Sequence, residues 1–330
     1  MYGTAWRVHE HGHWNEVLQL EEIPIPQPGP GEVLVATAAA GLNFADTLAI
    51  EGRYQIRPPL PFTPGIELAG RVQAVGASSG NLSIGTRVAA SVPWGAFSTH
   101  VCVPKTACLE VPYTMSDADA AAFVVTYQTA WFALVHRGNL KPGETLLVNN
   151  AAGGVGTAAL QLGLALGARV IASAGGSEKQ RLCLELGADA AIDYESQPLD
   201  QTVRELTDGK GADVIYESVG GAVFEASTRC IALEGRLVVV GFASGTIPSI
   251  QANRIMLKNI AVTGLNWGTY RDNQSPLIDR AHSELCALHA DGKIAPVIGT
   301  RYPFEDLVTA IDDLRGRRAQ GKSLLLFKVA

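Results

Sequence analysis

The chain has few of the residues from which disulfide scaffolds, metal lobes and membrane spans are built. It holds five cysteines and three methionines in 330 residues, and no two cysteines form a C-x-x-C pair. This excludes a four-cysteine zinc lobe and indicates reduced core cysteines of a cytoplasmic protein. No apolar run approaches the roughly 18 residues of a membrane span, and the N-terminal residues carry no basic-then-apolar signal pattern. We therefore expect no membrane partner and a cytoplasmic location.

An excess of positive charge is also missing. Lysine and arginine number 26 against 32 aspartates and glutamates, which gives a net charge of -6. No segment interleaves basic and aromatic residues, so nucleic acid is not expected as a partner. A hydrophobic share of 47% with 18% charged residues is typical of a globular protein, and 330 residues allow two domains with their own cores.

The chain does have a glycine-rich turn between an apolar strand and an apolar helix. The strand begins at Leu146, the turn covers 151–156, and a helix is predicted over 157–166. Ala151 replaces the first glycine of the G-x-G-x-x-G pattern, but a second strand over 169–173 completes a strand–turn–helix–strand unit. Small residues let the backbone approach a pyrophosphate, toward which the next helix points its N-terminus. The turn predicts a dinucleotide site, and the alternative is a structural turn with no ligand. The turn residues assigned to the cofactor are Ala152, Gly153, Gly154, Val155 and Gly156.

Two patterns divide the chain. The first third is rich in glycine, proline and short strand-like segments, which suggests a compact, barrel-like β domain. These segments cover 32–37, 66–75, 86–90 and 97–103. From about Ala120 strands and helices alternate, and six strands with intervening helices predict a doubly wound parallel sheet, so the fold class is α/β.

The later elements follow the same alternation. After the glycine-rich unit, strands are predicted over 190–192, 212–216, 236–240 and 260–265, with helices over 177–186, 199–206 and 222–230. The tail offers a helix over 276–290, a strand near Val297, a helix over 304–314 and a strand over 323–329. We expect this tail to return to the first domain.

Seven short motifs are specific when taken together. They are PGPGEV at 28–33, GLNFADT at 41–47, PFTPGIE at 61–67, TYQTA at 126–130, AAGGVG at 151–156, GAD at 187–189 and VVGF at 239–242. With them the chain resembles, over essentially its whole length, the zinc-free quinone oxidoreductase (zeta-crystallin-like) branch of the medium-chain dehydrogenase/reductase superfamily. The resemblance implies a GroES-like catalytic domain at 1–122, a Rossmann domain at 123–266, a return of 267–330 to the catalytic domain, and an active-site cleft between the domains.

The resemblance also allows a prediction about metal binding. Zinc-dependent relatives have a cysteine ligand where this chain has Asn43, and a G-H-E triplet where it has 65–67. Ile66 cannot bind a metal, so the ligand set of a catalytic zinc is not filled and no metal is expected. Without a Lewis acid, hydride addition to a quinone or enone, which its own carbonyl activates, is favoured over alcohol oxidation.

The expected cofactor is NADPH. Rossmann sites specific for NAD usually place an acid at the end of the second strand, and here that end, 173–177, has none. Lys179 follows in the first turn of a helix, where a cation is unfavourable unless a phosphate is bound. By the resemblance, Tyr194 supplies an aromatic hydroxyl to the same phosphate. The residues assigned to this end are Ser173, Gly175, Ser177, Lys179 and Tyr194. The alternative is a solvated lysine and a surface tyrosine.

The resemblance places further residues at the nicotinamide end. They are Thr126, Thr129, Gly241, Phe242, Ala243, Asn266 and Trp267. The segments 241–243 and 266–267 follow the fifth and sixth strands, at the edge where a doubly wound sheet binds ligands. For Thr126 the alternative is a helix-capping hydroxyl.

Three residues are candidates on the substrate side. Asn43 has two possible roles. Its side-chain amide is expected either to donate a hydrogen bond to a substrate carbonyl oxygen that gains enolate character, or to bond to the backbone of its own turn. Asp46 is expected to be a structural or hydrogen-bonding partner rather than a general acid. Many relatives have a tyrosine two residues after this aspartate, where this chain has Leu48. Tyr54 is then the remaining phenol that could protonate the enolate, and water is the alternative.

These predictions combine into an NADPH-dependent reductase of quinones or α,β-unsaturated carbonyl compounds. One alternative is an enoyl- or acrylyl-CoA-type reductase, which needs a basic channel for the CoA phosphates. Another is a non-catalytic NADPH-binding protein with a structural or regulatory role. The apolar strand 260–265, at the end of an open sheet, predicts pairing with a second copy and hence a homodimer through the edge of the Rossmann sheet.

Overall fold

The computed structural model describes residues 1–78 and 82–328. The chain forms two compact units: Met1–Val125, Arg271–His282 and Ile298–Ala330 make up the first, and Thr126–Tyr270 and Ser283–Val297 the second. The boundaries therefore fall slightly later than those expected after residues 122 and 266. The tail also returns to the first unit in two pieces rather than as a whole. Its middle piece is held in the second unit, where Gln161 exchanges two hydrogen bonds with the backbone of Ala295.

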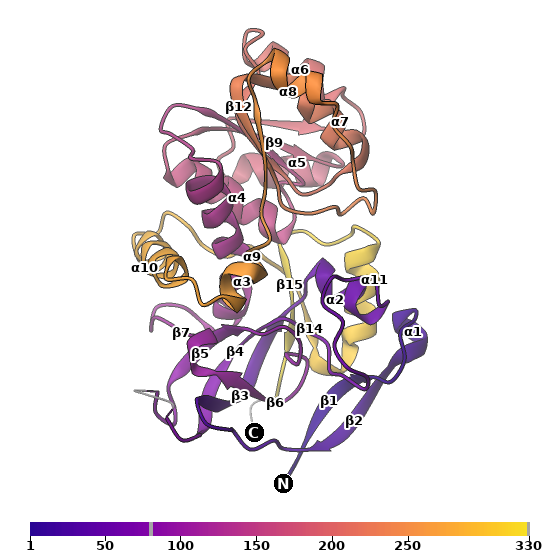
Figure 1. The fold of residues 1–330 in the computed structure, drawn as a ribbon, viewed down its shortest axis with the longest axis vertical. Helices are drawn as coiled ribbons and strands as arrows, with labels where there is room; N and C mark the ends of the chain where they lie inside the picture. The colour runs from indigo at the N-terminus through magenta and orange to yellow at the C-terminus, as the bar shows by residue number, and fades with distance from the viewer. Residues whose placement is uncertain (79–81, 329–330) are drawn as a thin grey trace. The chain divides into compact units, whose positions relative to one another are not determined.

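The first unit is built on a seven-stranded sheet (Figure 1). Its strands run in the order β14-β15-β3-β4-β5-β7, and β6 also pairs with β3. They are β3 (Glu32–Gly41), β4 (Glu67–Val75), β5 (Arg87–Ser91), β6 (His100–Pro104), β7 (Cys108–Glu110), β14 (Ile298–Pro303) and β15 (Lys322–Leu326). Because β3 pairs on both of its edges, Val33 and Val35 lie in one buried core with Phe97. This confirms the GroES-like, β-rich prediction.

Smaller elements complete the first unit. A two-stranded sheet joins β1 (Tyr2–Val8) to β2 (Leu18–Pro24), and short 3-10 turns cover η1 (Lys105–Ala107) and η3 (Phe304–Asp306). Helices α1 (Trp14–Val17), α2 (Phe44–Ile50) and α11 (Leu307–Arg315) pack against one another. The guanidinium of Arg315 lies 5.3 Å from the ring centre of Trp14 and 5.1 Å from that of Phe44, so one cation holds the three helices together.

Two strands of this unit differ from the sequence prediction. The strand predicted over 97–103 begins only at His100, because the carbonyls of Phe97 and Thr99 accept from Trp6 and Thr37 instead of a regular ladder. The strand predicted over 323–329 is β15 and ends at Leu326, while Val329 lies outside the described residues.

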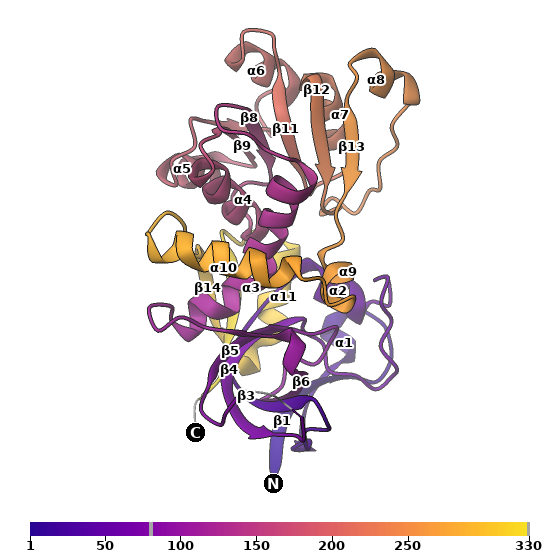
Figure 2. The ribbon, with the colours of Figure 1, turned by 60° about the vertical axis from the view of Figure 1, so that its left-hand side comes forward.

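The second unit holds a six-stranded, all-parallel sheet in the order β10-β9-β8-β11-β12-β13. The strands are β8 (Thr145–Asn149), β9 (Arg169–Ala174), β10 (Ala190–Asp193), β11 (Ala212–Glu217), β12 (Ile231–Val239) and β13 (Ala261–Gly264). The chain winds outward from β8 to β10, which forms one edge, then crosses to β11 and winds to β13 at the other edge. Figure 2 shows β11, β12 and β13 side by side. This is the predicted doubly wound Rossmann sheet.

Helices connect the successive parallel strands, and two more helices come directly after the last strand of this sheet in the sequence. The connecting helices are α4 (Gly154–Ala165), α5 (Ser177–Glu185), α6 (Leu199–Leu206), α7 (Gly221–Cys230) and α8 (Ala252–Leu257). Helices α9 (Trp267–Asp272) and α10 (Leu277–Ala290) follow, and the division between the two units falls within each of them. Leu146, Leu147 and Val148 are fully buried on β8, as a strand covered on both faces requires. The strand predicted over 236–240 starts earlier, because Ile231 is buried and pairs with Ala212 before a bulge.

One helix is longer and more apolar than the sequence pattern indicated. Helix α3 (Asp117–Trp131) continues through a π-helical stretch, η2 (Phe132–Arg137). Together the two stretches cover Asp117–Arg137, 21 residues that are long and apolar enough to cross a membrane by length and composition alone. Within this helix, 83% of the most apolar stretch of 18 residues is buried inside the protein. The expectation of no such segment missed it, because threonines and a glutamine interrupt the apolar run. A buried core helix of a water-soluble protein passes the same test.

Candidate functional site

The glycine-rich turn has the geometry that a dinucleotide site requires. Strand β8 ends at Asn149, and α4 begins at Gly154, three residues before the predicted start. A Cβ on Gly156 would lie 2.0 Å from the backbone oxygen of Asn150, and one on Gly153 would lie 2.9 Å from the Asn150 amide nitrogen. Only glycine fits this close approach, so the start of α4 packs tightly against the end of β8, and the N-terminus of the helix stands at the carboxyl edge of the sheet, where a pyrophosphate binds in this kind of fold.

The end of the second strand brings two predicted cofactor residues together. A Cβ on Gly175 would meet the Tyr194 hydroxyl at 2.9 Å, so the glycine lets the phenol approach the strand end. Lys179 is half-buried on the first turn of α5, and Ser177 is exposed at its start. The Ser173 hydroxyl is buried and has no hydrogen-bond partner within residues 1–78 and 82–328. These features fit a phosphate-bearing ribose at this strand end.

Sequence reasoning missed two acids at the same strand end. Asp193, the last residue of β10, accepts hydrogen bonds at Oδ1 from the backbone N–H of Gly176 at 2.9 Å and of Glu195 at 3.1 Å. These backbone bonds lower the pKa of Asp193, so its carboxylate is charged at neutral pH. A Cβ on Gly175 would also meet Glu195 Oε1 at 2.6 Å. The residues D-Y-E follow the predicted third strand, but only the pairing of β10 with β9 brings Asp193 to Gly176.

A buried carboxylate organises the loops behind the glycine-rich turn. Glu217, the last residue of β11, accepts from the backbone N–H groups of Val219 and Gly220, each at 2.7 Å. Its other oxygen accepts from the Asn149 amide at 2.5 Å and from Ser227 at 3.3 Å. Burial raises the pKa of Glu217, and these donors oppose the rise. One side chain therefore ties the end of β8 to the loop after β11.

The predicted segment 241–243 lies against that loop. The backbone N–H of Ala243 donates to the Ser218 carbonyl at 3.0 Å, and a Cβ on Gly220 would lie 3.2 Å from the Phe242 ring. Gly241, Phe242 and Ala243 are half-buried. The segment is thus fixed at the carboxyl edge of the sheet, the edge at which the glycine-rich turn also lies.

Thr126 and Thr129 lie on one buried face of α3. The helix begins at Asp117, so Thr126 stands well inside it, and the helix-capping alternative is wrong. Both threonines are buried. The Trp267 indole is also buried and donates to Gln128 of the same helix at 3.4 Å, whereas Asn266 is exposed.

The first unit holds a polar cluster around the start of α2. Asn43 is the N-cap of that helix, and its backbone N–H donates to Asp46 Oδ2 at 2.7 Å. Lys322 donates to Asn43 Oδ1 at 2.6 Å, which turns the amide nitrogen toward the Gly41 carbonyl at 3.2 Å and Glu67 at 3.5 Å. The Asn43 amide is therefore engaged within the protein, and this geometry matches the structural alternative rather than donation to a substrate.

Burial shapes the other two candidates on the substrate side. Desolvation raises the pKa of Asp46 to about 7, although the Asn43 N–H and the Lys322 charge oppose it. Its Oδ1 is buried with no hydrogen-bond partner in the part of the chain that the structure describes. Burial also raises the pKa of Tyr54; the Asp46 charge adds to this, and Arg271 opposes it. Tyr54 therefore keeps its proton at neutral pH.

Arg271 is a buried cation that the sequence could not place near Tyr54. Its side chain is 11% exposed, and it donates to the Ser91 hydroxyl at 3.0 Å and to Asp272 at 2.8 Å. By contrast, the Arg53 side chain is 60% exposed and pairs with Glu51. Within the described ranges, no group of three histidine, cysteine or acidic side chains could hold a metal ion.

Comparisons with known proteins match this geometry. Residues 29–113 match the family model described as the alcohol dehydrogenase GroES-like domain, and 154–283 that of zinc-binding dehydrogenase. The chain is 39% identical over 302 residues to "Quinone oxidoreductase-like protein 2 homolog" of Nematostella vectensis, covering 90% of this chain and 82% of that one. It is 37% identical over 313 residues to the "Quinone oxidoreductase" of Pseudomonas aeruginosa, covering 94% and 96%.

A solved structure supports the same family assignment as these sequence relatives. The quinone oxidoreductase of Escherichia coli complexed with NADPH superposes with a TM-score of 0.91 at 33% identity, covering 98% of this chain and 99% of that one. The fold and the glycine-rich turn define an NAD(P)-type medium-chain dehydrogenase/reductase. Within that superfamily, the chain belongs to the quinone oxidoreductase (zeta-crystallin-like) branch.

Proposed function

We propose that the protein is an NADPH-dependent reductase of quinones or α,β-unsaturated carbonyl compounds and needs no zinc. The observation that carries this proposal is the turn from β8 to α4, where Gly153 and Gly156 let the helix N-terminus pack directly against Asn150 at the end of the strand. The NADPH complex of the Escherichia coli relative supports the choice of cofactor.

The residues of the second unit fit the parts of NADPH in turn. The N–H groups of Gly154, Val155 and Gly156 begin α4 and suit the pyrophosphate. Lys179 and Tyr194 offer a cation and a phenol to the 2′-phosphate. Thr126, Thr129 and the segment 241–243 are assigned to the nicotinamide ribose and ring by the resemblance. When bound, NADPH supplies the hydride.

The first unit supplies proton chemistry. Tyr54 keeps its proton at neutral pH and is the proposed donor to the enolate that remains after hydride addition. Burial is the main reason that the pKa of Tyr54 is raised; the charges of Asp46 and Asp272 add to the rise, and the charge of Arg271 opposes it. Zinc independence is proposed because Ile66 replaces the histidine ligand and Lys322 occupies the Asn43 amide oxygen. Quinones and enones need no Lewis acid, since their own carbonyl activates them.

The experiment follows the absorbance of reduced nicotinamide with NADPH or NADH and either 1,4-benzoquinone or 9,10-phenanthrenequinone, with and without a chelator. Faster oxidation of NADPH than of NADH, unchanged by the chelator, is the expected result. Turnover with an enoyl-CoA and none with quinones would support the CoA alternative. Tight NADPH binding with no turnover on any acceptor would support the non-catalytic alternative.

We also propose a cytoplasmic homodimer formed through the edge of the Rossmann sheet. Strand β13 ends the sheet, and Met256 and Leu257, which precede it, are exposed at 68% and 72%. An apolar edge of this kind favours pairing with a second copy. The five free cysteines support a reducing compartment. Sedimentation of the protein and of the M256K/L257K variant tests the dimer, with a lower mass expected for the variant.

A further inference from the structure

Two carboxylates lie beside the turn that is assigned to the 2′-phosphate of NADPH. The turn 174–177 links β9 to α5, and its Gly176 N–H is a backbone donor within the segment assigned to the 2′-phosphate. In the structure this N–H donates to Asp193 Oδ1 at 2.9 Å. Asp193 comes from the neighbouring strand β10, so the acid that the second strand lacks is supplied by the third.

The position of Asp193 is held by its own turn. Oδ1 also accepts from the Glu195 N–H at 3.1 Å, and Oδ2 accepts from the Ser196 hydroxyl at 3.0 Å. Two donors of its own turn, together with the Gly176 N–H, therefore fix a charged carboxylate beside Gly176. A phosphate that arrives here meets a negative charge and finds one backbone donor already used.

Glu195 adds a second charge at the same place. A Cβ on Gly175 would meet Glu195 Oε1 at 2.6 Å and the Tyr194 hydroxyl at 2.9 Å, so the carboxylate and the phenol lie over the same glycine. Glu195 is exposed, so water and salt weaken its charge but do not remove it. A 2′-phosphate that binds Tyr194 at this glycine therefore lies close to the Glu195 carboxylate.

We propose that Asp193 and Glu195 are specificity-determining residues that limit the preference for NADPH over NADH. This inference rests on the proposed function. Both charges repel the 2′-phosphate, which carries about two negative charges at neutral pH, and leave the 2′-hydroxyl of NADH unaffected. Asp193 also keeps the Gly176 N–H from the phosphate. The acidic pair thus opposes the attraction of Lys179 at the same strand end.

The experiment measures dissociation constants for NADPH and NADH by nicotinamide fluorescence, at low and at high salt. In the D193N variant the amide oxygen still accepts from Gly176, so only the charge is removed; E195Q removes the second charge. We expect each variant to tighten NADPH binding roughly three- to tenfold, with less than about a twofold change for NADH. The gain should shrink at high salt, because exposed charges are screened.

The matched control is D208N. Asp208 is an exposed acid of the same unit, and its φ of 51° is one that asparagine adopts readily, so the change removes one charge without strain. The dissociation constants of this variant should equal those of wild type. Circular dichroism of each variant checks the fold.

The outcomes separate the two proposals. If wild type binds NADPH and the variants leave the ratio of the two dissociation constants unchanged, the acidic pair sets no specificity. If the dissociation constants for NADPH and NADH change by the same factor, the inference is also overturned, because Asp193 then only shapes the turn. If wild type binds no NADPH at all, the proposed function fails first, and this inference fails with it.

Discussion

The ammonium of Lys322 lies 2.8 Å from Glu67 Oε2 and 2.6 Å from Asn43 Oδ1, deep within the first unit. The Lys322 side chain is 5% exposed, and that of Glu67 is fully buried. Glu67 Oε1 in turn accepts from the backbone N–H of Val125 at 2.7 Å. A single buried ion pair thus joins the closing strand β15, the start of α2 and the helix α3.

Loss of this cation should destabilise the protein strongly. The K322M variant leaves the Glu67 carboxylate buried and without its partner, so we expect the free energy of unfolding to fall by about 3–5 kcal/mol. The double variant K322M/E67Q removes both charges and should recover a large part of this loss. Urea unfolding of both variants measures the effect. Equal stability of K322M and wild type would show that the pair contributes nothing.

The stability of the protein should also depend on pH through Asp46. Burial raises its pKa to about 7 in the folded chain, against roughly 3.9 in an unfolded chain. Between these values the folded chain binds more protons, so the stabilising contribution of Asp46 is present below about pH 4 and is lost as the pH rises through 7.

The D46N variant does not titrate and isolates this effect. From pH 5 to pH 8, wild type should lose roughly 2–3 kcal/mol of unfolding free energy relative to D46N. The other titrating groups are the same in both proteins, so their contributions cancel when the unfolding free energy of D46N is subtracted from that of wild type. A difference that stays constant over this range would mean that Asp46 is ionised throughout.

Tyr54 should matter for turnover and not for cofactor binding. The Y54F variant removes the proposed proton donor, so we expect kcat with an enone to fall at least about tenfold while the dissociation constant for NADPH stays unchanged. The control is Y113F, because Tyr113 is 99% exposed and lies on the same unit. An unchanged kcat in Y54F would indicate that water protonates the enolate.

The sequence predicted the features that local patterns encode. The turn at Gly153 and Gly156, the alternation of strands and helices, and the helix 199–206 depend on neighbouring residues, and the structure has them. Thr126 was ambiguous only because the start of its helix was not visible in the pattern; the structure places that start at Asp117.

The rest depends on contacts between distant segments. Lys322 and Asn43 are 279 residues apart, and nothing in an apolar closing strand signals that its lysine enters a buried cluster. Asp193 was passed over because its position beside Gly176 follows from the pairing of β10 with β9, which a single-sequence pattern does not give. The burial that raises the pKa of Asp46 likewise belongs to the folded core.

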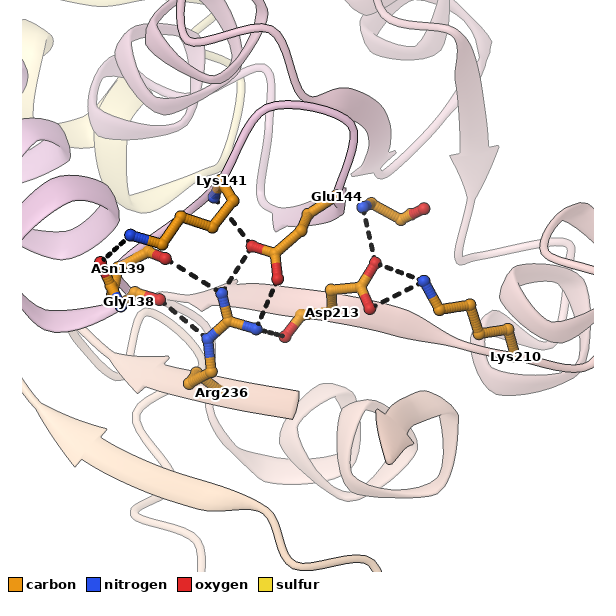
Figure 3. Close-up of polar contacts among 8 residues, drawn as sticks. Gly138, Asn139, Lys141, Glu144, Lys210, Asp213 and Arg236 are labelled. Atoms are coloured by element: carbon orange, nitrogen blue, oxygen red, sulfur yellow. Dashed lines mark hydrogen bonds and ion pairs between the residues drawn. The ribbon is translucent and has the colours of Figure 1, made fainter. Parts of the chain in front are cut away.

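An arginine at the amino edge of the Rossmann sheet should affect stability without affecting cofactor binding (Figure 3). Arg236 uses its whole guanidinium: it contacts both Glu144 oxygens at 2.6 and 3.0 Å and the carbonyls of Gly138, Asn139 and Asp213. Lysine cannot reproduce this planar set, so R236K should lose about 2 kcal/mol of unfolding free energy. The dissociation constant for NADPH should not change.

A nearby ion pair provides the comparison. Lys210 lies 3.0 Å from Asp213, but its side chain is 63% exposed, so K210M should cost well under ~1 kcal/mol. If K210M and R236K were equally destabilising, the number of hydrogen bonds at Arg236 would not be the cause.

The glycine-rich turn provides the sharpest test of the cofactor site. In a G156A variant the new Cβ would lie 2.0 Å from the Asn150 oxygen and 2.8 Å from the Ala151 Cα, and both are backbone atoms that cannot rotate away. The turn must shift, so NADPH affinity should fall at least about tenfold, with a loss of stability of about 1–3 kcal/mol. A G264A variant is the control, because a Cβ there meets no atom within 4 Å among the described residues. Fluorescence titration at a temperature where both variants are folded separates the two effects. NADPH binding by G156A as tight as by G264A would mean that the cofactor does not lie on this turn.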